Sequence, residues 1–138
     1  MTKRALTETE LRAAPKAQYM SGAQHEFFRQ RLLALRSQLL ENVRDTTEHL
    51  HATEAASDPS DRATQEEEQA LELRTRDRER KLLKKIDEAL ERITAGTYGF
   101  CKDTGEPIGI GRLLARPTAT LSVEAQDKRE RTQRQFAD

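Results

Sequence analysis

Residues 54–63 read Glu-Ala-Ala-Ser-Asp-Pro-Ser-Asp-Arg-Ala and interrupt two long stretches of helical pattern. A proline inside a helix removes a backbone hydrogen bond, so Pro59 argues against one continuous helix through this segment. Asp58 is a candidate N-cap, because Asp followed by Pro at the first helical position is a typical helix start. The sequence therefore predicts a turn over 54–63, with one helix on each side of it.

The segment before the turn has the pattern of a coiled-coil helix. Ser21 and Gln24 have the spacing of a capping box, and the seam positions that follow are spaced 4, 3, 4, 4, 3 and 4 residues apart. This spacing is close to a heptad repeat. We expect a helix over about 22–53, and its seam consists of Phe28, Leu32, Leu35, Leu39, Val43, Thr46 and Leu50.

The segment after the turn carries a second helical pattern, from about 64 to 95, which Gly96 ends. Its apolar positions are Ala70, Leu73, Leu83, Ile86, Leu90 and Ile93. A helix of about 30 residues is roughly 45 Å long. Two such helices joined by a short turn run antiparallel, so we expect a long hairpin over 22–95 with its tip at 54–63.

The two ends of the chain are expected to form a small globular part. Residues 97–117 hold strand-like residues around the turn Asp103-Thr-Gly105, and residues 120–136 have the pattern of a final polar helix. The apolar residues available for this core are Phe100, Ile108, Ile110, Leu113 and Leu114. The expected fold is mainly α: a long antiparallel coiled-coil hairpin (22–95), a globular region with a C-terminal helix (97–138), and an N-terminal segment (1–21) that packs on the globular part.

Composition narrows the possible functions. The 138 residues include 35% charged and 4% aromatic residues, with 24 acidic side chains balancing 24 basic ones. Proteins that bind duplex DNA through its phosphates usually carry a basic excess, so direct DNA binding is not expected. No apolar run approaches a membrane span, and the N-terminus lacks the apolar core of a signal peptide. We expect a cytoplasmic monomer.

The charges are segregated along the hairpin. Residues 54–68 hold six acidic side chains and one basic, whereas residues 74–85 hold seven basic side chains and two acidic. One interpretation is a solvated helix, because acidic residues near a helix N-terminus stabilise it by about 0.3–1 kcal/mol each. The other is a probe whose acidic tip enters a basic or metal-bearing cavity, since complementary charge guides docking.

The single cysteine belongs to a spacing that resembles a metal site. Cys101, Thr104, Ser122 and Ala125 follow the pattern C-x2-T-x17-S-x2-A, which with four cysteines would be a zinc finger. Zinc requires thiolate or imidazole ligands, which threonine, serine and alanine do not supply. The sequence therefore predicts a globular region that folds by apolar packing, without zinc or any other cofactor.

Two further charged groups are candidate sites. Asp58 and Asp61, three residues apart at the turn, either cap the second helix, hold a divalent cation weakly or form hydrogen bonds with a moving segment of a partner. A basic cluster that suits a phosphate-bearing ligand, or is ordinary surface charge, consists of Lys84, Lys85, Arg112 and Arg116. No nucleophile–base pair or glycine-rich phosphate loop is present, so we do not expect an enzyme.

From Tyr19 onward the chain carries three groups of motifs that together are specific to one protein family. They are Asp58-Pro-Ser-Asp-Arg-Ala63, Glu66-Glu-Glu68 with Leu71-Glu-Leu-Arg74 and Arg76-Asp-Arg-Glu-Arg80-Lys-Leu82, and Tyr98-Gly-Phe-Cys101 with Ile108-Gly-Ile110 and Ala115-Arg-Pro-Thr118. On these motifs the chain resembles the DksA/TraR family of transcription regulators. The resemblance implies a hairpin that enters the secondary channel of RNA polymerase and, with the alarmone ppGpp, modulates transcription initiation in the stringent response.

The resemblance also implies roles for particular residues. Asp58, Asp61 and Ala63 are implied to act at the tip, near the polymerase active site, and Arg74 and Arg78 to contact the polymerase rim. Leu82, Lys85 and Arg116 match positions implied in ppGpp binding, although a further basic position of that site is Gln126 here. Only the first of the four family cysteines remains, so the resemblance implies a zinc-independent member.

Two other functions remain open on the sequence. A transcript-cleavage factor of the Gre type uses a similar hairpin, whose tip carboxylates would help hold the polymerase's catalytic metal. A plain coiled-coil interaction protein would have no polymerase role. Release of short RNA from backtracked complexes is expected only of the cleavage factor, and failure to bind core polymerase only of the interaction protein.

Overall fold

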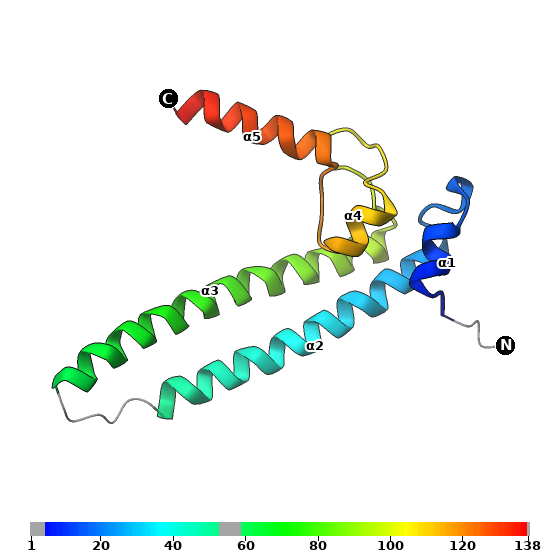
Figure 1. Cartoon of the computed structure of the whole chain (residues 1–138). Coiled ribbons are helices and arrows are strands. Elements are labelled where there is room, and N and C mark those ends of the chain that lie inside the picture. The colour runs from blue at the N-terminus through cyan, green and yellow to red at the C-terminus, as the bar shows by residue number, and fades with distance from the viewer. Residues whose placement is uncertain (1–4, 53–58, 138) are drawn as a thin grey trace. The chain divides into compact units, whose positions relative to one another are not determined.

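The computed structural model describes residues 5–52 and 59–137, and in this part of the chain all regular structure is helical (Figure 1). Two long helices, α2 (Gly22–Ala52) and α3 (Pro59–Ala95), are preceded by α1 (Glu8–Ala13) and a 3-10 turn (Lys16–Gln18). They are followed by α4 (Ile110–Ala115) and α5 (Val123–Ala137). The prediction of a mainly α fold with a long helical hairpin is confirmed.

The chain divides into two compact units. The hairpin unit comprises Leu33–Asp87, and the terminal unit comprises Met1–Leu32 together with Glu88–Asp138. Each is described by itself below.

In the hairpin unit, α2 and α3 run side by side in opposite directions (Figure 1). Leu39 and Ile86 are buried, and Arg36 on α2 forms a salt bridge with Asp87 on α3, with 2.8 Å between Nε and Oδ1. Two helices bury only a narrow stripe on each other, which explains why so few residues of this unit are fully covered.

Three details of the predicted helices are wrong. Leu35, placed in the seam of the first helix, is 42% exposed, and Leu73, expected on the apolar side of the second helix, is 56% exposed. A hairpin has no third helix, so positions at the flank of the seam stay open to solvent. The second helix begins at Pro59, five residues before the predicted 64, as the Asp-Pro start signal indicated.

The terminal unit has the larger core. Its fully covered residues come from both ends of the chain: Leu11, Phe28 and Leu32 from the N-terminal part, and Tyr98 and Leu113 from the C-terminal part. The rings of Phe28 and Tyr98 lie 5.5 Å apart between centroids. The N-terminal segment is therefore built into this core.

The predicted strands of residues 97–117 are absent from the described structure, which has one isolated antiparallel bridge between Phe100 and Pro107. Ile110, expected in a strand, starts the helix α4 instead. Phe100, expected in the core, is 39% exposed, whereas Ile108 and Leu113 are buried as expected.

Candidate functional site

The tip of the hairpin presents two of its three predicted residues to solvent. Asp61 and Ala63 lie in the first turns of α3 and are exposed. Asp58 lies outside the described residues, so neither its proposed cap nor a cation site with Asp61 is described. The exposed carboxylate of Asp61 is free to meet a partner, because the hairpin itself does not cover it.

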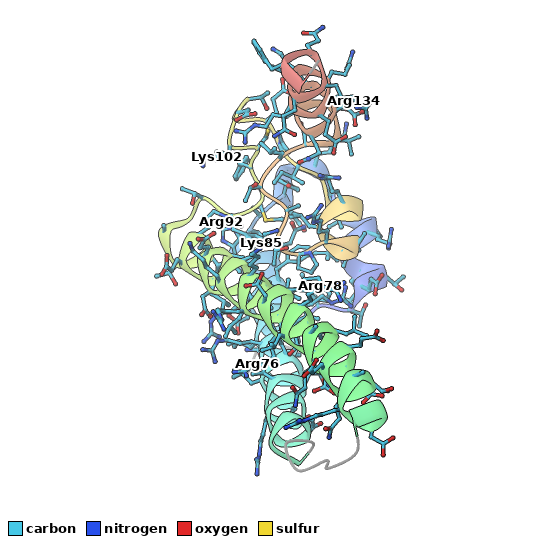
Figure 2. All side chains as sticks on the ribbon, turned by 90° about the vertical axis from the view of Figure 1, so that its left-hand side faces the viewer. Arg76, Arg78, Lys85, Arg92, Lys102 and Arg134 are labelled. Atoms are coloured by element: carbon cyan, nitrogen blue, oxygen red, sulfur yellow. The ribbon has the colours of Figure 1, made fainter. Side chains whose placement is uncertain are left out.

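Four predicted contact residues fall on one side of α3. Spacings of 3, 4, 4 and 3 residues place these four and one further leucine along one line of the helix surface. The line consists of Leu71, Arg74, Arg78, Leu82 and Lys85. We call this line the first row. Figure 2 shows Arg78 and Lys85 on one side of α3 and Arg76 on the other. All five residues of the first row are exposed.

The first row contains both basic and exposed apolar side chains. Leu71 is 58% exposed and Leu82 is 42% exposed, although both are large apolar side chains. Lys81, which lies off this row, pairs with Asp77 at 3.1 Å. A line of cations between exposed leucines suits a protein surface that carries both acidic and apolar groups.

The residues predicted for ppGpp divide between the two units. Leu82 and Lys85 belong to the hairpin unit, whereas Arg116, also exposed, belongs to the terminal unit. Arg112, placed in the same basic cluster, instead donates from Nε to the carbonyl of Leu121 at 2.8 Å. Its side chain therefore links α4 to the segment that precedes α5.

The four positions of the zinc-finger spacing contact one another. The Cys101 thiol is buried and forms hydrogen bonds with the hydroxyls and backbones of Thr104 and Ser122. The Ser122 hydroxyl also accepts a hydrogen bond from the backbone N–H of Ala125 at 3.2 Å. The chain thus closes the finger with hydrogen bonds at the positions where a zinc finger has metal ligands.

These side chains do not fit zinc. They offer one thiol, two hydroxyls and the methyl group of Ala125, whereas structural zinc takes four thiolate or imidazole ligands. Among the side chains that the structure describes, which belong to residues 5–45 and 61–136, no three of His, Cys, Asp or Glu gather into a group able to hold a metal ion.

The surroundings of Cys101 favour its thiolate. Burial raises the pKa of the thiol, but the hydrogen bonds from Thr104 and Ser122 together outweigh burial and bring the pKa to about 6. A negative sulfur held by hydroxyl and backbone donors resembles, in its electrostatics, one ligand of a metal site.

Sequence reasoning missed the residue that joins the N-terminal segment to the finger. The Tyr19 hydroxyl donates to the carbonyl of Gly99 at 2.5 Å and accepts from the N–H of Gly109 at 3.0 Å. Its ring meets that of Phe100 edge-on, with 5.6 Å between centroids. A second tyrosine, Tyr98, donates its hydroxyl to the carbonyl of Pro117 at 2.7 Å.

Met20 completes this junction. Its backbone has a positive φ of 54°, and its N–H donates to the buried side chain of Gln24 at 2.8 Å. A Cβ added at Gly99 would lie only 2.6 Å from the Met20 sulfur. The only sequence signal for this junction was the presence of two large residues, Tyr19 and Met20, ahead of the first long helix.

Searched over its described residues, the chain has no helix that is long and apolar enough to cross a membrane.

Known proteins resemble the chain over nearly its whole length. Residues 24–93 match the family model of the DnaK suppressor protein DksA, N-terminal domain, and residues 96–131 match the prokaryotic dksA/traR C4-type zinc finger. The second match includes the finger that keeps one cysteine.

Two curated relatives carry the same name. The RNA polymerase-binding transcription factor DksA of Caulobacter vibrioides is 50% identical over 95% of this chain and 93% of its own length. The protein of the same name from Escherichia coli is 47% identical over 89% of this chain and 82% of its own length.

A solved structure shares the fold. The transcription factor DksA2 from Pseudomonas aeruginosa superposes with a TM-score of 0.86, at 49% identity, over 93% of this chain and 99% of that one.

Proposed function

This chain belongs to the DksA family, and we propose that it is an RNA polymerase-binding transcription factor that acts through its helical hairpin. The curated relatives are named for that activity at 47–50% identity. The observation on which the proposal rests most is the exposed tip of a hairpin that matches the family's N-terminal domain: Asp61 and Ala63 project from the start of α3.

In this proposal the hairpin enters the secondary channel of the polymerase. Asp61 and Ala63 approach the active site, and the first row, through Arg74 and Arg78, contacts the channel rim. The factor works without chemistry of its own, by changing the stability of promoter complexes. It is therefore not an enzyme, and its site of action is the cytoplasm, where the polymerase is.

The alarmone ppGpp is the proposed effector. Leu82 and Lys85, exposed at the base of the first row, would bind it together with the polymerase, and Arg116 would contribute a guanidinium, which suits phosphate groups. Gln126, where the family has a basic residue, uses its side-chain amide to donate to Glu130 at 3.1 Å. We therefore expect a weaker ppGpp response than in relatives with a cation there.

The factor is also proposed to work without zinc. The thiol, hydroxyl and methyl groups at the finger positions support this, together with the hydrogen bonds that join the four positions. A zinc-independent factor keeps its fold when zinc is scarce.

Transcription in vitro from a ribosomal RNA promoter tests the proposal. The wild-type chain should inhibit this promoter with core polymerase and sigma factor, and ppGpp should increase the inhibition. Asp61→Asn keeps the size of the side chain and removes its charge, so it should abolish regulation while leaving polymerase binding nearly unchanged. Full regulation by Asp61→Asn would contradict the role of the tip.

A cleavage assay separates this function from the Gre-type alternative. Backtracked elongation complexes should keep their RNA intact in the presence of the chain. Release of short 3′ fragments, lost in Asp61→Asn, would show that the tip assists RNA cleavage instead.

A further inference from the structure

A second line of residues runs along α3, offset by two residues from the first row. Its residues have the same spacings of 3, 4, 4 and 3, and they are Leu73, Arg76, Arg80, Lys84 and Asp87. Two residues correspond to about 200° around a helix, so the two rows lie on different sides of α3. Figure 2 shows this for Arg76 and Arg78. We call this line the second row.

The second row continues onto α2. Its last residue, Asp87, is joined to Arg36 at 2.8 Å. On α2, Leu33 and Leu40 lie three residues before and four residues after Arg36, on the same side of the helix. Because the helices run antiparallel, Leu40 lies beside the part of the second row that precedes Asp87. The face therefore includes both helices of the hairpin unit.

This face is basic and partly apolar. Leu33, Leu40 and Leu73 are 37%, 41% and 56% exposed. Its one acidic residue, Asp87, is already paired with Arg36.

The three central cations of the second row have no acidic partner in the described part of the chain. Arg76 is half-buried, whereas Arg80 and Lys84 are exposed, and none of the three forms a salt bridge there. By contrast, the adjacent Lys81 pairs with Asp77 at 3.1 Å. The charge of these cations is therefore not neutralised by any side chain that the structure describes in the hairpin unit.

We propose that the second row is a separate docking face for the polymerase. It binds a surface of the polymerase that carries acidic side chains and apolar patches against which the exposed leucines pack. This inference rests on the proposed function. Exposed leucines favour a protein partner, because a phosphate backbone offers them no apolar surface. The row also lacks the aromatic side chains on which unpaired bases stack. The hairpin would then be held on two sides, by the first row and the second.

Charge reversal at neighbouring positions tests the proposal. Arg80→Glu alters the second row, and Lys81→Glu makes the same change of charge one residue away, off both rows. Arg76→Glu/Arg80→Glu extends the perturbation, and Arg80→Gln removes charge without reversing it. Binding of each full-length variant to immobilised core polymerase is measured by surface plasmon resonance, at 0.1 M and 0.5 M NaCl. Circular dichroism checks that each variant keeps its helices.

Arg80→Glu should weaken binding about tenfold at low salt, and the double variant more, chiefly through slower association. Arg80→Gln should fall between Arg80→Glu and wild type, and Lys81→Glu should stay within about twofold of wild type. High salt should reduce these differences, because it screens exposed charges.

Equal binding by wild type and Arg76→Glu/Arg80→Glu would overturn the inference while leaving the proposed function intact. A loss that appears only with promoter DNA present would also overturn it, because nucleic acid would then be the partner. If the wild-type chain does not bind core polymerase, the proposed function itself fails.

Discussion

Replacement of Tyr19 by Phe should destabilise the terminal unit without disturbing its packing. The phenyl ring can keep its edge-on contact with Phe100, and only the hydroxyl is lost. That hydroxyl joins the carbonyl of Gly99 to the N–H of Gly109, groups that are 80 and 90 residues away along the chain. Its removal leaves both backbone groups without this partner.

The expected loss of unfolding free energy follows from the burial of the two backbone groups that the hydroxyl bonds. Gly99 is buried and Gly109 is half-buried, so water replaces the lost hydrogen bonds poorly. The carbonyl of Gly99 still accepts from the N–H of Ile108 at 2.8 Å, so the N–H of Gly109 is the group left without a partner. A buried polar group in that position costs about 1–3 kcal/mol. A loss near 2 kcal/mol lowers the melting temperature of a chain of this size by roughly 8 °C.

Urea unfolding followed by circular dichroism and by tyrosine fluorescence measures this loss. The chain has two tyrosines and no tryptophan, so emission from Tyr19→Phe reports on Tyr98 alone, within the terminal unit. Thr132→Val is the matched control. It removes a hydroxyl that donates to the carbonyl of Lys128 at 2.9 Å on the exposed helix α5, and it should change the unfolding free energy by less than about 0.5 kcal/mol. If Tyr19→Phe costs no more than Thr132→Val, the hydrogen bonds of the Tyr19 hydroxyl do not stabilise the terminal unit.

Three further predictions concern the finger. The folded-state pKa of Cys101, about 6, lies below the ordinary 9.0, so the thiolate's contribution is fully present above pH 9 and is lost as the pH falls through 6. The free energy of unfolding should therefore rise as the pH increases from below 6 to above 9, and urea titrations of Cys101→Ala should lack this rise. Gly99→Ala should lower the melting temperature more than Gly105→Ala. Both glycines have positive φ, but only at Gly99 does the new Cβ meet the Met20 sulfur, and equal losses would contradict this contact. EDTA should leave the melting curve unchanged and atomic emission should find no zinc in the purified protein, whereas one zinc per chain would refute a metal-free finger.

The sequence was most informative about the hairpin. Phe28, Leu32 and Leu39 were predicted in the seam and are buried, because a repeated local spacing directly determines which side of a helix is apolar. The same pattern misplaced Leu35 and Leu73, since periodicity does not show how many neighbours a helix has. The start of α3 was placed too late because its first ten residues are almost entirely polar.

The finger was harder to predict, because its contacts link distant parts of the chain. The Tyr19 hydroxyl bonds Gly99 and Gly109, which lie 80 and 90 residues further along the chain, and no local pattern predicts such contacts. By contrast, the spacing of Cys101, Thr104 and Ser122 suggested a common site, and the structure joins these three residues by hydrogen bonds. The helix α4 was missed because its six residues are too few to show a helical period.

Site-specific photocrosslinking from the hairpin tip tests the proposed insertion most directly. A photoreactive amino acid replaces Ala63, which is exposed at the start of α3, and in a second protein it replaces Phe136, which is 86% exposed on α5. With core RNA polymerase, the probe at position 63 should crosslink to segments lining the interior of the secondary channel, and the probe at 136 should not. Crosslinks from position 63 confined to the outer surface of the polymerase, or no crosslinks from it despite binding, would contradict the account.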